Sequence, residues 1–155
     1  MWKMTRLIAV TLMLSALGGC SGCSSGSSGL RDGYYTAEAA DFDHLGWKEY
    51  LTIYVNNNTI VTAEYNAKNA SGFLRSWDMD YMRRMNKATG TYPNKFSRAY
   101  TSALLNRQNP NQINAIYGAE QSHKIFQLLA EAAIDRARAG DKKVAFVSLP
   151  ETAAP

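Results

Sequence analysis

A short run around Gly118 carries the residues of this chain that are best suited to ligand chemistry, and it reads Tyr117-Gly118-Ala119-Glu120-Gln121-Ser122. A helix that begins near Ala119 leaves its first backbone N–H groups unpaired, and with the helix dipole these groups form an anion site. Gly118 allows a ligand to approach the backbone closely. Glu120 places its own carboxylate in that field, where a first-turn acidic residue is stabilised by about 0.3–1 kcal/mol. The run therefore predicts an anion site that already carries a negative side chain.

Two neighbouring side chains extend the candidate site. Ser122 offers a hydroxyl as a substitute attachment point, although a helix-capping or first-turn role is commoner for such a serine. His123 offers a ligand or a proton relay, but we expect a solvated side chain on an early helical turn. His44 stands far away in the sequence, and two separated histidines without cysteine lack a zinc-like spacing. We therefore predict no metal site.

The acidic residues do not form a legible catalytic set. Asp41 with Asp43, and Asp78 with Asp80, are pairs spaced by two, which share a face only on a strand. Asp78 and Asp80 suit the start of a helix instead. No nucleophile stands beside a base, so we expect a carrier or binding protein rather than an enzyme.

Four aromatic residues are candidates for lining a cleft, because ring stacking holds flat ligands. They are Trp47, Trp77, Tyr81 and Tyr117. Core packing is the alternative, and we expect it for Trp77 and Tyr81, which fall on one stripe of a predicted helix. Tyr117 precedes the glycine turn, where we expect it to fill space that a ligand would otherwise use.

The N-terminus predicts export and lipid anchoring. Lys3 and Arg6 precede an apolar run, Leu7 to Leu17, that suits a signal peptide but is shorter than the roughly 20 residues of a membrane-spanning helix. The run ends in Leu-Gly-Gly-Cys20, which resembles a bacterial lipobox; an ordinary secretion signal with a chance cysteine is the alternative. We predict a signal peptide over residues 1–19, lipidation at Cys20, and a membrane-anchored lipoprotein on the extracytoplasmic side of the bacterial cell envelope.

Composition divides the remaining chain. Residues 20–30 hold the cysteine and a serine- and glycine-rich stretch that predicts a flexible tether. Residues 31–140 have the length of one domain, and residues 141–155 form a C-terminal tail. The formal net charge of +4 is too small, and the Lys/Arg clusters are too short, to indicate a nucleic-acid partner.

The first half of the domain predicts strands and the second half predicts helices. Residues 32–39, 47–55 and 59–65 are rich in β-favouring residues, and 47–55 alternates with a period of two. Short connections between them predict an antiparallel meander. Helical spacing follows in 76–88, from Pro93, and in 119–139. The fold class is therefore α+β, a small antiparallel sheet of three to four strands packed by about three helices. Residues 113–117 and 144–149 are the two candidates for an added strand.

Ordered matches over residues 32–139 resemble the FMN-binding domain family, in its extracytoplasmic lipoprotein subgroup. The matching residues are Asp32-Gly33-Tyr34-Tyr35-Thr36-Ala37-Glu38, Gly46-Trp47, Asn57-Asn58-Thr59-Ile60-Val61, Ser76, Asp78, Tyr81, Gly90, Pro93, Tyr117-Gly118-Ala119, Ser122, Phe126 and Leu129-Ala130. This resemblance implies an exported, membrane-tethered flavoprotein that transfers electrons through FMN to a redox partner protein.

Two residues, Tyr117 and Glu120, depart from the family's flavin motif. The family motif runs Ser-Gly-Ala-Thr, and its threonine hydroxyl is the usual attachment point of the FMN phosphate, whereas this chain has Glu120 at that position. A carboxylate cannot form that phosphoester, so we expect any FMN to bind noncovalently at Gly118 to Ser122, with Trp47 or Trp77 nearby. The alternative is a scaffold that has lost its cofactor and serves as a ligand- or protein-interaction lipoprotein of the cell envelope.

Overall fold

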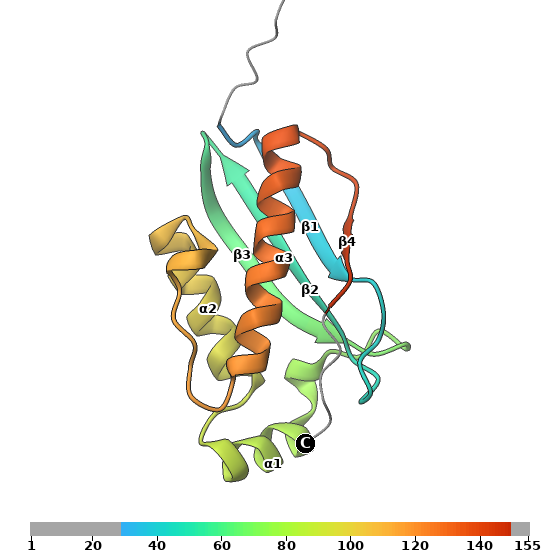
Figure 1. Ribbon diagram of the computed structural model, residues 1–155. Coiled ribbons are helices and arrows are strands. Elements are labelled where there is room, and N and C mark those ends of the chain that lie inside the picture. The colour runs from blue at the N-terminus through green and yellow to red at the C-terminus, as the bar shows by residue number, and fades with distance from the viewer. Residues whose placement is uncertain (1–28, 150–155) are drawn as a thin grey trace, which may run out of the picture.

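Three consecutive strands form the predicted meander: β1 (Gly33–Ala39), β2 (Lys48–Asn56) and β3 (Thr59–Lys68). β2 pairs antiparallel with both neighbours in the computed structural model, which describes residues 29–149 (Figure 1). The predicted signal peptide 1–19, the lipidation site Cys20 and most of the tether lie outside the described residues. Asn57 and Asn58 turn the chain between β2 and β3 with φ of 49° and 60°. This confirms the predicted turn, because asparagine tolerates the left-handed region.

The fourth strand differs from the expectation of an all-antiparallel sheet. β4 (Ala145–Val147) pairs parallel with β1, so the strand order is β3-β2-β1-β4 and the sheet is mixed. The prediction of a strand at 144–149 is confirmed and the one at 113–117 is wrong. The apolar character of this segment reflects burial of the Ile113 side chain rather than strand pairing. The N–H of Ile116 donates to the Tyr100 hydroxyl instead of to a neighbouring strand.

Three helices complete the α+β fold: α1 (Met79–Thr89), α2 (Pro93–Arg107) and α3 (Glu120–Ala139). Short 3-10 turns, η1 (Arg75–Trp77) and η2 (Pro110–Gln112), precede α1 and follow α2. Figure 1 shows α3 lying across β1 and β2, α2 beside β3, and α1 beyond one end of the sheet. Within residues 29–149, no helix combines the length and the apolar character needed to cross a membrane.

The core lies between α3 and the sheet. Leu51, Ile53 and Val55 alternate along β2 toward the helices, as the period of two predicts, and all three are fully buried. Phe126 and Leu129 meet them from α3. Ala130, Ala133 and Ala137 have small side chains on the same face of α3, so the helix packs closely on the sheet. Gly140 ends α3 in the left-handed conformation that glycine favours.

The start of α1 explains why Trp77 is not in the core. Asp78 caps α1 by accepting a hydrogen bond from the N–H of Tyr81 at 2.8 Å, so the helix begins at Met79. Trp77 therefore lies in η1, outside the helical stripe, and its side chain is 62% exposed. The expectation of core packing for Trp77 is wrong.

Candidate functional site

Gly118 makes the turn that leads into α3. Its φ is 78°, and a Cβ at this position would lie 2.6 Å from Cβ of Thr89 at the end of α1. The next residue, Ala119, is buried at the N-cap, and its carbonyl accepts hydrogen bonds from the His123 N–H at 2.9 Å and the Tyr100 hydroxyl at 3.1 Å. The glycine is thus required both by the backbone conformation and by the close packing of α1 against the turn.

Glu120 occupies the anion position that the sequence predicts. Its carboxylate accepts a hydrogen bond from the Gly118 N–H at 3.0 Å. Its own backbone N–H and that of Gly118 hold the pKa of this exposed carboxyl below the ordinary value of 4.5. The first turn of α3 therefore stabilises a negative charge, and the charge belongs to the chain itself.

We expect the depressed pKa of Glu120 to appear in the pH dependence of stability. A carboxylate whose pKa is lower in the folded state stabilises that state above its unfolded pKa of about 4.5, and this contribution disappears as the pH falls through the folded-state pKa. The difference in unfolding free energy between the native protein and Glu120→Gln should therefore shrink on acidification from pH 6. Urea denaturation at a series of pH values measures it. A difference that stays constant with pH would contradict the charge interaction.

Two neighbours of Glu120 have separate roles. Ser122 lies in the first turn of α3, as expected, and its backbone carbonyl accepts a hydrogen bond from the Tyr65 hydroxyl at 3.0 Å. His123 is not solvated: its Nε2 lies 2.7 Å from the Ile113 carbonyl and its ring lies 5.4 Å from that of Tyr100. The expectation for His123 is wrong because the loop after η2 folds back over the helix start.

The candidate aromatic residues do not pack together around the glycine turn. Tyr117 is 83% exposed, so its side chain lies in solvent and does not fill space at the turn, contrary to the expectation. Trp47 is buried, with its ring 6.5 Å from that of Tyr81. Trp77 packs edge-on against Phe73 at 6.0 Å between ring centroids.

A buried polar cluster, absent from the sequence expectations, lies under the start of α3. Glu49 and Arg75 are 5% and 4% exposed, and Arg75 Nη1 donates to Glu49 Oε1 at 2.9 Å. The single proton of the Tyr65 hydroxyl is shared between the other oxygen of Glu49 and the Ser122 carbonyl. The signal for this cluster was the alternation in β2, which places Glu49 on the same inward face as Leu51 and Ile53.

Charge and burial oppose each other within this cluster. Burial, followed by the carboxylate of Glu49, raises the pKa of the Tyr65 phenol, so the hydroxyl remains a hydrogen-bond donor. Burial disfavours the charged form of Arg75, but Glu49 and the nearby tyrosines favour it, and the net pKa of the guanidinium is raised. Nε and Nη2 of Arg75 are buried without a hydrogen-bond partner among residues 29–149. The cluster therefore keeps its ion pair at some desolvation cost.

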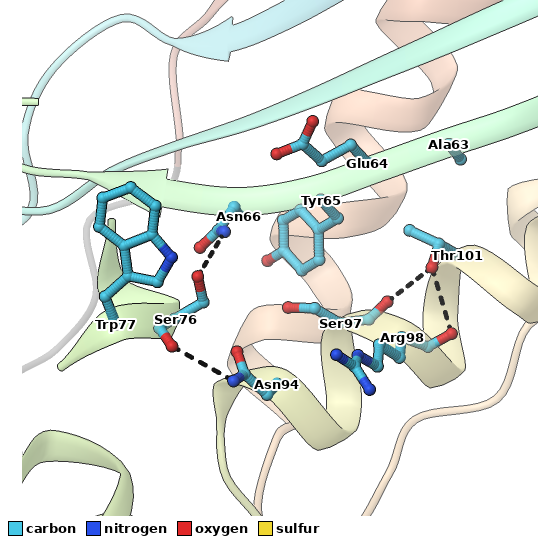
Figure 2. Close-up of a pocket in the computed structure, with 10 residues that line it drawn as sticks. All are labelled: Ala63, Glu64, Tyr65, Asn66, Ser76, Trp77, Asn94, Ser97, Arg98 and Thr101. Carbon is cyan, nitrogen blue, oxygen red and sulfur yellow. Dashed lines mark hydrogen bonds between the residues drawn. The ribbon is translucent and has the colours of Figure 1, made fainter. Parts of the chain in front are cut away.

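A polar pocket of about 310 Å³ lies between β3, η1 and the first turns of α2 (Figure 2). β3 is an edge strand of the sheet, so this side of it is open to other elements. The residues that meet around the pocket include Tyr65, Asn66, Ser76, Trp77, Asn94 and Ser97. Of these, only Trp77 was a candidate from the sequence. Within the described part of the chain, no cluster of three or more His, Cys, Asp or Glu residues is placed to hold a metal ion.

Known proteins resemble the chain over most of its length. It is 34% identical over 127 residues to the 15 kDa lipoprotein of Treponema pallidum (strain Nichols), which covers 82% of this chain and 86% of that lipoprotein. The crystal structure of the CPE2226 protein from Clostridium perfringens has a TM-score of 0.75 and 33% identity, and covers 78% of this chain and 99% of that one. No family model matches the chain. Because the likeness to the treponemal protein extends over most of both sequences, this chain belongs to the family of the 15 kDa lipoprotein.

Proposed function

We propose that this protein is a lipid-anchored lipoprotein of the bacterial cell envelope whose exported domain is a binding module without covalently attached flavin. Membership of the 15 kDa lipoprotein family supports the class, and the signal peptide followed by Leu-Gly-Gly-Cys20 supports anchoring at Cys20 on the extracytoplasmic side. No set of nucleophile and base was legible in the sequence, which favours binding over catalysis.

The position of Glu120 is the observation that carries the proposal. Covalent flavin attachment in the resembling family needs a threonine hydroxyl, and Glu120 supplies a carboxylate instead. That carboxylate is hydrogen-bonded to the Gly118 N–H in the helix-start field where a phosphate would lie. The residues present therefore do not fit a flavin bound through a phosphoester.

Peptide mass spectrometry tests this proposal directly. Trypsin should release residues 108–124, a segment without internal lysine or arginine that contains both Glu120 and Ser122. We expect this peptide to have its unmodified mass when the full-length protein is exported from cells that also make a flavin transferase. Glu120→Thr is the matched control, since it restores the family hydroxyl in the same backbone. An added FMN mass on the native peptide would overturn the proposal.

Noncovalent FMN, used for electron transfer with a redox partner protein, is our second candidate. Gly118 and Ser122 would offer backbone N–H groups to the phosphate, while the N–H of Ala119 donates to the Ile116 carbonyl at 2.9 Å. The resemblance to the FMN-binding family supports that placement. The Thr91 hydroxyl is buried near this turn and has no hydrogen-bond partner within residues 29–149. Thr91 bonds through its N–H to Thr89, and Thr89 is the residue that packs against Gly118. Such a ligand must displace the Glu120 carboxylate, whose charge repels phosphate at short range.

The displacement gives this second candidate its own test. FMN should bind Glu120→Gln more tightly than the native protein, because the substitution removes the repelling charge. Riboflavin, which lacks the phosphate, should bind both forms equally. Equilibrium dialysis of the full-length protein with each flavin measures the two affinities. The absence of FMN binding in both forms would exclude flavin as the ligand and leave the binding-module proposal intact.

A further inference from the structure

The polar pocket beside β3 has the dimensions of a small-molecule site. Its volume of about 310 Å³ is at the lower end of the roughly 300–1,000 Å³ that such sites usually occupy. A ligand of about one ring fits a pocket of this volume. The pocket is formed by different residues from those of the glycine turn at 117–120, so it is a separate candidate site.

Trp77 gives the pocket an aromatic wall. Its side chain is 62% exposed although it is packed edge-on against Phe73, so its orientation is held while one surface stays open. Figure 2 shows the nitrogen-bearing edge of the indole turned toward Asn66 and Ser76. An exposed, held indole of this kind suits a ligand with a flat or C–H-rich face and polar edges.

The pocket floor is hydrogen-bonded in a way that leaves both donors and acceptors free. Asn66 Nδ2 donates to Ser76 Oγ at 2.8 Å, and Asn94 Nδ2 donates to the Ser76 carbonyl at 3.2 Å. These bonds fix both amides, so the Asn94 carbonyl oxygen faces the pocket as an acceptor (Figure 2). The Ser97 hydroxyl points into the same space and has no partner within residues 29–149. Hydroxyl groups, which both donate and accept, match this mixture.

Arg98 adds one positive charge to this lining. Its guanidinium extends along the pocket beside Asn94 and forms no ion pair in the part of the chain that the structure describes. Glu64, the acidic residue of the lining, keeps its negative charge and accepts a hydrogen bond from the Tyr50 hydroxyl at 2.8 Å. The Arg98 guanidinium can bind a ligand carboxylate through two parallel hydrogen bonds.

We propose that this pocket binds one sugar ring that carries a carboxylate, with the ring face on Trp77, the hydroxyls on Asn94 and Ser97, and the carboxylate on Arg98. The inference deepens the proposed function, on which it rests, by naming the ligand class of the binding module. An envelope protein on the extracytoplasmic side would meet such sugars in surface polysaccharides or as free uronic acids, and both sources share this chemistry.

Calorimetric titration of the full-length lipoprotein in detergent micelles tests the proposal. Glucuronic acid and glucose are the paired probes, because they differ by the carboxylate alone. We expect glucuronic acid to bind about fivefold more tightly than glucose, as an exposed arginine–carboxylate pair predicts.

Trp77→Ala should weaken the binding of both sugars about tenfold through loss of the stacking surface. Arg98→Gln should weaken glucuronic acid to the level of glucose and leave glucose unchanged. Repeating the titration with an oligouronide separates a polymer site from one that takes only the free sugar.

Two matched variants control for surface effects. Phe146→Ala removes an aromatic ring of similar exposure, 66%, from β4, and Arg107→Gln removes a charge from the far end of α2. Both should leave sugar binding unchanged. Absence of binding at about 10 mM sugar, tenfold above a dissociation constant of about 1 mM, would overturn the inference, as would full binding by Trp77→Ala. The mass of peptide 108–124 judges the proposed function independently of either result.

Discussion

Replacing Arg75 with methionine should lower the free energy of unfolding by about 3–5 kcal/mol, because it leaves the Glu49 carboxylate buried without its cation. Both side chains are almost fully buried, and their contact at 2.9 Å joins β2 to η1. Urea denaturation followed by circular dichroism measures the loss. A change below about 1 kcal/mol would show that water reaches the carboxylate, as it does for surface ion pairs.

The double variant Glu49→Leu with Arg75→Met is the informative control. Replacing both members of a buried pair by apolar side chains is often neutral or stabilising. The two buried nitrogens of Arg75 that lack partners increase the desolvation cost of the native pair. We therefore expect the double variant to recover most of the stability lost in Arg75→Met, with the Tyr65 hydroxyl keeping its bond to the Ser122 carbonyl. A double variant as unstable as the single one would show that the pair is needed for packing as well as for charge.

Replacing Gly118 with alanine should lower the free energy of unfolding by about 2–5 kcal/mol, the sum of left-handed backbone strain and overpacking. The new Cβ would lie 2.6 Å from Cβ of Thr89 and 3.0 Å from its backbone carbonyl, so α1 must shift. The same denaturation experiment measures the effect. Because the turn orients the first N–H groups of α3, the variant should also lose the Glu120 contribution to pH dependence.

Gly90 provides a matched control for the packing part of that loss. Its φ of 74° is close to the 78° of Gly118, but a Cβ at Gly90 would meet nothing within 4 Å. Gly90→Ala should therefore cost about 1–2 kcal/mol, the backbone strain alone. Equal losses in the two variants would contradict the close approach of α1 to the glycine turn.

Local rules explain the part of the fold that was predictable. The alternation of Leu51, Ile53 and Val55 predicts a half-buried strand because successive side chains of a strand point to opposite faces. Asn57 and Asn58 predict the following turn, and Gly140 predicts the end of α3, because each residue type tolerates φ above zero. Glu120 was likewise placed at a helix start from the sequence. The proposed flavin chemistry of that turn stays a prediction.

The tertiary structure alone decided the features that depend on residues far apart in the chain. Glu49 pairs with Arg75 across 26 positions, and β4 joins β1 in parallel, contacts that no local periodicity encodes. The polar pocket likewise exists only because α2 and η1 meet the edge strand β3. The sequence by itself determined most of the segments that form strands and helices, since those preferences depend on neighbouring residues, whereas the partners of buried charges and the lining of the pocket depend on how the segments pack.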